Sequence, residues 1–205
     1  MDFNEAKDFV LIKLKKELKP TLYYHNYQHT LDVCEATENL SIMEQVDIES
    51  KFILLTAALY HDTGFFWQYD HNEPLACDFA RDTLPGFNYT PDQITVICKL
   101  IMATQMPHHP KTHLEKIICD ADLDYLGRSD FFITALRLHR EWSENSSKKI
   151  PFRDWYLRQF EFVRHHQYFT ASANKLRNER KNENLMQIEE LLGLLKESTG
   201  RKNEG

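Results

Sequence analysis

The chain has 205 residues, of which 42% are hydrophobic and 12% aromatic, a composition that supports a packed globular core and excludes a disordered chain. Its formal charge of -6 argues against broad electrostatic binding to nucleic acid, while leaving room for a local basic pocket that holds one small phosphate. No apolar run approaches the roughly twenty residues that cross a bilayer, and the N-terminus MDFNEAKDFV is acidic and polar where a secretory signal is basic and then apolar. We therefore expect a cytoplasmic protein without membrane or nucleic-acid partners.

Apolar residues recur at helical spacing through the first third of the chain. This spacing predicts an amphipathic helix over residues 2–19, ended before Pro20, and a second helix over residues 26–40. A third helix is predicted over residues 49–61, where FILLTAALY is apolar on nearly all sides. A helix without a polar face is buried, so this segment should lie at the centre of the core.

The middle of the chain contains three further helices whose ends are marked in the sequence. EPLACDFARDTL predicts a helix that is stopped by the Pro-Gly pair after it. Thr90 and Gln93 have the spacing of a capping box and predict a helix that reaches about residue 104. Thr112 and Glu115 repeat this device and open a helix that carries CDADLDYL toward residue 127.

The last third of the chain is also helical in its spacing. It predicts a helix through FFITALRLHREW, a polar loop SENSSKK, an aromatic-rich helix from Pro151 to Phe169 and a last helix over residues 171–196. No strand-like alternation persists. We therefore expect a single all-α domain over residues 1–196, with residues 197–205 as a disordered tail.

The four cysteines sit within apolar helical patterns and show no C-x-x-C pairing. Buried thiols are favoured over disulfides or a zinc cage. The four are Cys34, Cys77, Cys98 and Cys119.

Histidines and carboxylates gather in the segments YHNYQHTLDV, ALYHDTGF and ICDADLDYLG. His29, the pair His61-Asp62 and Asp122 each follow or interrupt an apolar helical face that should point inward. Converging helices would bury two imidazoles and two carboxylates together, and a divalent cation compensates such a cluster. This nitrogen and oxygen set without thiolate suits Mn²⁺, Mg²⁺, Fe²⁺, Co²⁺ or catalytic Zn²⁺ better than a structural zinc cage.

These three segments resemble the HD-domain superfamily of metal-dependent phosphohydrolases, whose pattern is a His, an adjacent His-Asp pair and a distant Asp. The recognisable motifs span residues 22–130, and the remainder is compatible with the small stand-alone bacterial members. The resemblance implies a helical bundle with a metal site in its core, and the ligands His29, His61, Asp62 and Asp122. Asp120 is the alternative for the last ligand. The two aspartates point about 200° apart on a helix, so both are not expected to bind one ion.

YHNYQHTLDV also looks like the signature of the cyclic-nucleotide phosphodiesterases, a branch of the same superfamily. That likeness implies that His25 donates a proton to the leaving oxygen, and the family role of Asp62 implies that it orients water as well as binding metal. His25 and His29 lie one helical turn apart, so one can bind metal while the other reaches the substrate. The segment TGFFWQYDHNEP lacks the second Asp and following His of that branch, which disfavours a true cyclic-nucleotide enzyme.

Other polar residues are weaker candidates for the site. Glu73 and His71 could contact substrate, although Glu73 also suits the start of a helix and His71 a solvated loop. Arg128, close after the Asp122 motif, could hold a phosphate. His71, His108 and His109 could extend the site to a second ion, but all lie in polar, proline-flanked loops, so one ion is favoured.

The sequence thus predicts a metal-dependent phosphohydrolase that cleaves a phosphate ester or anhydride bond of a small metabolite, a nucleotide being favoured, by attack of metal-activated water. The alternatives are an HD scaffold that binds a nucleotide without hydrolysing it, a cyclic-nucleotide phosphodiesterase and a di-iron oxygenase. Which phosphate bond is cleaved does not follow from the ligand set.

Overall fold

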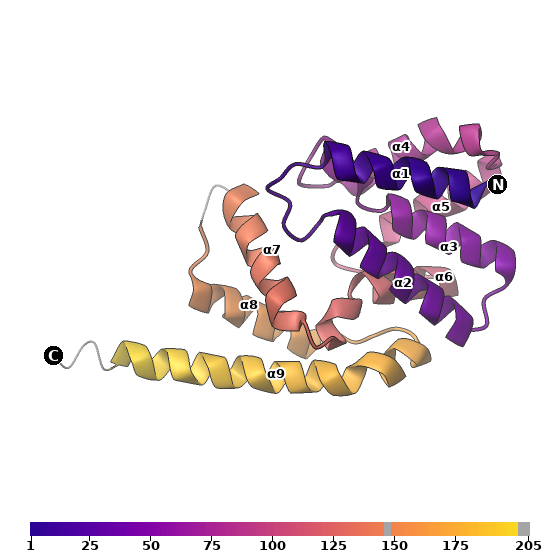
Figure 1. Ribbon diagram of the computed structural model, residues 1–205. Coiled ribbons are helices and arrows are strands. Elements are labelled where there is room, and N and C mark those ends of the chain that lie inside the picture. The colour runs from indigo at the N-terminus through magenta and orange to yellow at the C-terminus, as the bar shows by residue number, and fades with distance from the viewer. Residues whose placement is uncertain (146–148, 201–205) are drawn as a thin grey trace. The chain divides into compact units, whose positions relative to one another are not determined.

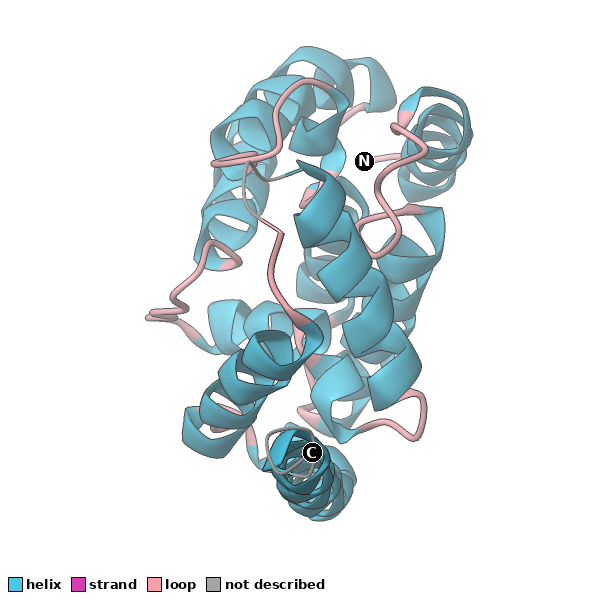
Figure 2. Ribbon diagram, turned by 90° about the vertical axis from the view of Figure 1, so that its left-hand side faces the viewer, coloured by secondary structure: helices cyan, strands magenta, loops and turns pink. Residues whose placement is uncertain are grey.

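The structure is a computed structural model that describes residues 1–145 and 149–200, with side chains to residue 196 (Figure 1). Within this part of the chain the regular elements are helices and short 3₁₀ turns, and no strand is present (Figure 2). The predicted all-α class is therefore confirmed. None of the described helices has both the length and the apolar character needed to cross a membrane.

The chain divides into two compact units, the first formed by Met1–Asp124 and the second beginning at Tyr125. All four predicted metal ligands belong to the first unit. A compact unit is not the same as an independently folding domain, so the single domain over residues 1–196 stays a prediction. The predicted tail is helical as far as Gly200, and residues 201–205 lie outside the described residues, as do residues 146–148 of the predicted polar loop.

The first unit is built from six helices and two 3₁₀ turns. They are α1 (Phe3–Glu17), α2 (Tyr27–Met43), α3 (Ile48–Tyr60), η1 (Thr63–Phe66), α4 (Glu73–Thr83), η2 (Leu84–Phe87), α5 (Pro91–Ala103) and α6 (His113–Asp122). Helix α3 packs against α1, α2, α5 and α6, and every residue from Ile53 to Tyr60 is buried. The central position predicted for this apolar segment is therefore confirmed.

Both predicted capping boxes are present. The Thr90 hydroxyl accepts a hydrogen bond from the Gln93 backbone N–H, and the Gln93 side chain accepts one from the Thr90 backbone N–H. Thr112 and Glu115 make the same reciprocal pair. These bonds satisfy backbone N–H groups that have no partner within the first turn of a helix. The residue pattern of such a box is local, so the starts of α5 and α6 could be predicted from the sequence.

The remaining helices are α7 (Phe131–Asn145), α8 (Phe152–His165) and α9 (Ala171–Gly200), preceded by the 3₁₀ turn η3 (Asp124–Gly127). Helix α8 ends at His165, four residues before the predicted end at Phe169, because the backbone is extended at His166. The carbonyl oxygen of His166 accepts a hydrogen bond from Lys181.

The helix predicted to carry CDADLDYL onward is also shorter than expected, since α6 ends at Asp122 and the chain tightens into η3. Gly127 lies so close to α9 that a Cβ there would be 2.4 Å from the carbonyl oxygen of Arg177.

Candidate metal centre

Three helix ends in the first unit bring the predicted ligands together. His29 lies in the first turn of α2, whose start is fixed by the Asn26 side chain, an acceptor for the backbone N–H groups of Gln28 and His29. His61 and Asp62 follow the last turn of the buried helix α3. Asp122 is the last residue of α6, which packs against both α2 and α3. The packing of these helices therefore sets the position of each ligand.

The ligand atoms of His29, His61 and Asp122 all lie within 4.8 Å of one another, and Asp62 contacts both imidazoles. The Nε2 atom of His29 lies 3.4 Å from Asp62 Oδ2 and 3.3 Å from Asp122 Oδ1. The Nε2 atom of His61 lies 3.1 Å from Asp62 Oδ2 and 3.5 Å from Asp122 Oδ1. Two atoms bound at right angles to one ion, each about 2.1 Å from it, are about 3 Å apart. The observed separations therefore suit a divalent cation of this size.

Three of these atoms are buried without a hydrogen-bond partner among the described residues: His29 Nε2, His61 Nε2 and Asp62 Oδ2. Their nearest charged neighbours are the other side chains of the cluster, at the distances given above. Burying polar atoms without a partner costs roughly 1–3 kcal/mol each. A cation between them would accept all three lone pairs, and the chemistry of the donor set therefore fits a metal. Asp62 also fails to cap the following turn with its side chain, which removes the structural explanation for its burial.

The imidazole of His61 is held in the form that a metal ligand needs. Its Nδ1 atom lies 2.8 Å from the backbone carbonyl oxygen of Ala58. A carbonyl oxygen only accepts, so Nδ1 carries the proton and donates it. The lone pair of the neutral ring is then on Nε2, which faces the cluster.

The charges of the four side chains shift one another's pKa values. Burial alone raises the pKa of Asp122, but the imidazoles of His29 and His61 outweigh it and hold that pKa well below its usual range. Burial likewise raises the pKa of Asp62, and His61 brings the net pKa below its usual value. At His61 burial lowers the pKa, whereas Asp62 and Asp122 raise it well above its usual range. A proton on His61 therefore balances the carboxylates, and a divalent cation would take its place.

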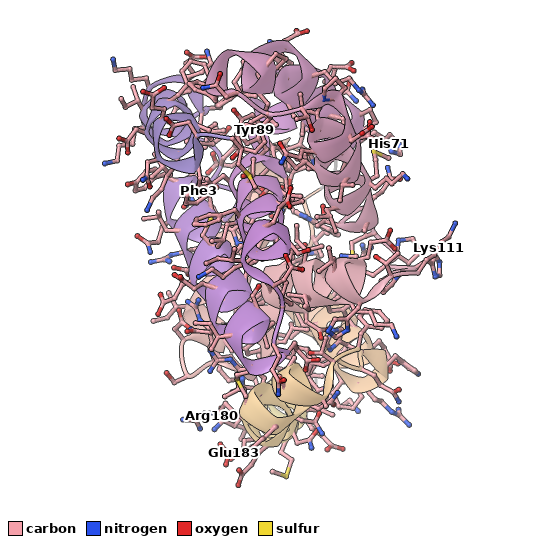
Figure 3. The ribbon with its side chains drawn as sticks, turned by 90° about the vertical axis from the view of Figure 1, so that its right-hand side faces the viewer. Phe3, His71, Tyr89, Lys111, Arg180 and Glu183 are labelled. Atoms are coloured by element: carbon pink, nitrogen blue, oxygen red, sulfur yellow. The ribbon has the colours of Figure 1, made fainter. Side chains whose placement is uncertain are left out.

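A cavity of about 200 Å³ opens beside the ligands. Besides Asp62 and Asp122 it is lined by His25, His71, Asn72, Glu73, Thr104, Gln105 and Met106. The ring of His25 stacks on Phe65, with centroids 4.5 Å apart, and its centroid lies 5.8 Å from that of His29. Figure 3 shows His71 at the edge of the molecule, in agreement with its exposed side chain. The cavity thus runs from the buried ligands to the surface.

The structure gathers most, but not all, of the other predicted site residues. His25, His71 and Glu73 line the cavity. Arg128 belongs to the second unit, where its guanidinium pairs with both carboxylate oxygens of Asp130, so its phosphate-binding role stays a prediction. Asp120 is 1% exposed, and the group of mutually close ligand atoms found among the described residues comprises His29, His61 and Asp122, without Asp120 or Asp62.

The histidines considered for a second ion are placed differently. His108 Nε2 lies 3.8 Å from Asp122 Oδ2, but it also lies 3.0 Å from the carbonyl oxygen of Thr104 and must donate its proton there. That nitrogen has no lone pair for a metal in the neutral ring. His109 lines a separate groove. This arrangement favours one ion.

Sequence reasoning missed several residues of the cavity wall. Asn72 is 7% exposed, and its Oδ1 atom is buried without a hydrogen-bond partner among the described residues. Thr104, Gln105 and Met106 come from the end of α5 and the loop after it. Asn72 stands between two residues that were singled out, His71 and Glu73, and that adjacency was the one signal that could have found it.

Comparisons with known proteins support the fold. No protein-family model matches the chain. An uncharacterized protein of Clostridium beijerinckii is 24% identical over 99 residues, which are 46% of this chain and 62% of that protein, so the match spans less than two thirds of the relative's length.

Two solved structures align over nearly the whole chain. The crystal structure of Bacillus subtilis YpgQ in complex with ADP aligns with a TM-score of 0.65 and 17% identity, over 92% of this chain and 95% of that one. The crystal structure of a predicted HD superfamily hydrolase from an uncultured Thermotogales bacterium aligns with a TM-score of 0.59 and 17% identity, over 94% and 92%. Together with the helical architecture, these likenesses show that the chain has the all-α, HD-type fold that its motifs predicted.

Proposed function

We propose that this protein is a metal-dependent phosphohydrolase that acts on a nucleotide carrying a phosphate chain. The observation that carries the proposal is the convergence of buried, unpartnered ligand atoms from His29, His61 and Asp62 on one point beside an open cavity. Asp122 completes the set of four. Two proteins of the same fold support it, one described as a predicted HD superfamily hydrolase and one crystallised with ADP.

The four side chains would hold one divalent cation. When bound there, such an ion supplies positive charge to phosphoryl oxygens and makes water a better nucleophile near neutral pH. The protein's own contribution is to fix the ligands beforehand, because His61 is oriented by the Ala58 carbonyl and His29 by the capped start of α2. Because the ligands are already ordered, metal binding does not have to supply the free energy for arranging them.

The size of the cavity favours a substrate whose phosphate end is bound while the rest stays outside. At about 200 Å³ it is smaller than the roughly 300–1,000 Å³ that encloses a drug-sized ligand. A phosphoryl group fits in this space, and the remainder of a nucleotide would leave past the exposed His71. His25, which stacks on Phe65 and lines the cavity, would donate a proton to the leaving oxygen. Asn72 offers a buried acceptor to a donor group or water.

The test is phosphorus NMR of the protein reconstituted with Mn²⁺ and incubated with ADP and ATP, with a chelator added before acquisition. We expect new orthophosphate, pyrophosphate or monophosphate signals, and their identity reports which bond is cleaved. The matched control is Asp122→Asn, which keeps the side-chain shape but removes the negative charge from the ligand set. The variant should show neither hydrolysis nor tight Mn²⁺ binding.

Two outcomes would count against the proposal in different ways. If both proteins leave the nucleotides intact while the wild type binds them, the protein is a nucleotide-binding scaffold rather than an enzyme. If Asp122→Asn hydrolyses as fast as the wild type, the reaction takes place elsewhere and the site assignment is wrong.

A further inference from the structure

Helices α4 and α5 bring Cys77 and Cys98 into contact within the first unit. The Cys77 thiol donates to the backbone carbonyl oxygen of Cys98 over 3.4 Å, and the Cys98 thiol contacts the carbonyl oxygen of Cys77 over 3.6 Å. The residues are 2% and 5% exposed, and both are free thiols. Buried thiols were predicted from the sequence. Their pairing across the two helices was not, because nothing in the spacing of the cysteines indicates it.

One member of the pair can be reached from outside. Cys98 lines a groove of about 960 Å³ that is separate from the metal cavity and is also bordered by Arg81, Lys99 and His109. Lys111, at the rim of this groove, projects from the surface in Figure 3. The groove offers a small oxidant a path to Cys98, whereas Cys77 is not among the residues that line it.

The environment prepares the two sulfurs for different roles. Interaction with the Cys77 side chain lowers the pKa of Cys98 to about 7 against the effect of burial, with a further contribution from the nearby charge of Arg81. The same interaction and burial raise the pKa of Cys77. Thiolate is the nucleophilic form of cysteine, so Cys98 would react first.

We propose that Cys98 and Cys77 form a peroxide-reactive disulfide site. The Cys98 thiolate attacks one oxygen of hydrogen peroxide, which breaks the O–O bond, releases hydroxide and leaves a sulfenic acid on Cys98. The Cys77 sulfur then attacks the Cys98 sulfur, and the sulfenic oxygen leaves as water with the thiol proton. Overall, two thiols lose two electrons to one peroxide, which becomes two waters once the hydroxide is protonated.

Such a bond would join two helices that each have one end beside the metal cavity. Helix α4 begins with Glu73, and α5 leads into Gln105, whose side-chain amide lies 3.4 Å from a Glu73 carboxylate oxygen. Oxidation would therefore restrain the wall that a substrate passes. Only this consequence rests on the proposed function, because the disulfide itself is detected by mass.

The experiment treats the reduced, full-length protein with hydrogen peroxide in the presence of a chelator and follows it by intact-mass and peptide mass spectrometry. We expect a loss of about 2 Da, the mass of two hydrogens, and a fall in free thiols from all four cysteines to the two outside the pair. Trypsin should release residues 52–81 linked to residues 82–99, which carry Cys77 and Cys98. Dithiothreitol should restore every thiol.

Variants that keep the side chain small separate the two roles. Cys77→Ala should leave Cys98 as a sulfenic acid that dimedone traps, and Cys98→Ala should leave Cys77 unmodified. A Cys34→Ala, Cys119→Ala double variant serves as the matched control and should form the disulfide as the wild type does. Four intact thiols after treatment, or a link that includes Cys34 or Cys119, would overturn the proposal whether or not the protein hydrolyses nucleotides.

Discussion

The imidazole of His61 is prepared for a cation by two opposing neighbours. The Ala58 carbonyl holds the proton on Nδ1, and the carboxylates of Asp62 and Asp122 attract a second proton to Nε2 and raise the pKa of the ring well above its usual value. A metal that binds Nε2 must displace that second proton. Binding at this site is therefore linked to pH through one identified atom.

We predict that Mn²⁺ binding near pH 7 releases about one proton. Because the pKa of His61 is raised in the folded protein, its proton stabilises the metal-free fold below the ordinary pKa of about 6.5, and that stabilisation is lost as the pH rises through the raised pKa. Metal affinity should accordingly increase with pH over the same interval. Calorimetric titrations in buffers of different ionisation enthalpy measure the released proton directly.

The control for this titration is His165→Ala, which removes an exposed histidine of the second unit. It should release the same number of protons as the wild type. A wild-type value near zero at neutral pH would mean that His61 is already neutral before the metal arrives.

His25 stands on the cavity wall and is not one of the four proposed metal ligands, so removing it tests proton donation separately from metal binding. We expect His25→Ala to retain Mn²⁺ affinity and to lose turnover by about 10²-fold or more for substrates with poor leaving groups. Substrates with a nitrophenolate leaving group, which needs no proton, should lose much less. Equal losses for both kinds of substrate, measured as kcat, would argue against proton donation by His25.

At the level of residues, the cluster of His29, His61, Asp62 and Asp122 was predictable because His, His-Asp and Asp stand in distinct motifs on apolar helices. Asn72 was not, since a single amide in a polar loop has no spacing pattern. The pairing of Arg128 with Asp130 was not predicted either, and its phosphate contact stays a prediction.

The turn after His61-Asp62 packs against the start of α4 so closely that a side chain is excluded between them. A Cβ on Gly64 would lie 1.9 Å from the backbone carbonyl oxygen of Asn72, and backbone cannot move aside as a flexible side chain can. This contact holds Asn72 and Glu73 beside the ligands.

We predict that Gly64→Ala costs about 1–3 kcal/mol of stability and weakens metal binding, because the loop that carries Asp62 or the one that carries Asn72 must shift. Gly86→Ala is the matched control, since a Cβ there meets no atom within 4 Å. Denaturant unfolding and Mn²⁺ titration of both variants provide the measurement. Equal stability of the two variants would show that the contact is easily relieved.

At the level of elements, helix starts were predicted better than helix ends. The capping boxes of α5 and α6 consist of neighbouring residues, so the sequence alone determines them. After α6 the chain forms η3, whose last residue Gly127 meets the backbone of Arg177, a partner fifty residues away in the chain. Such long-range contacts have no local signal.

A metal that binds only the folded first unit should stabilise the whole protein against unfolding. At a Mn²⁺ concentration about 100 times the dissociation constant, we predict a rise in melting temperature of roughly 5–10 °C, which a chelator reverses. Asp62→Asn should show little or no rise, because it lacks the charge that balances the ion. A full shift in that variant would place the stabilising metal at another site.

Because α3 is buried along its whole second half, the folded chain holds the four proposed ligands in place before any ion binds. An ion then binds to a site that is already folded. Which ion stays bound depends on its affinity for the site and on its concentration. Affinity for nitrogen and oxygen sites rises along the first transition series, so zinc or copper in excess would displace the weaker-binding manganese or iron. The metal found in a purified sample would thus depend on the metal content of the growth medium. The ion that supports activity has to be identified by removing all metal from the protein and adding back one metal at a time.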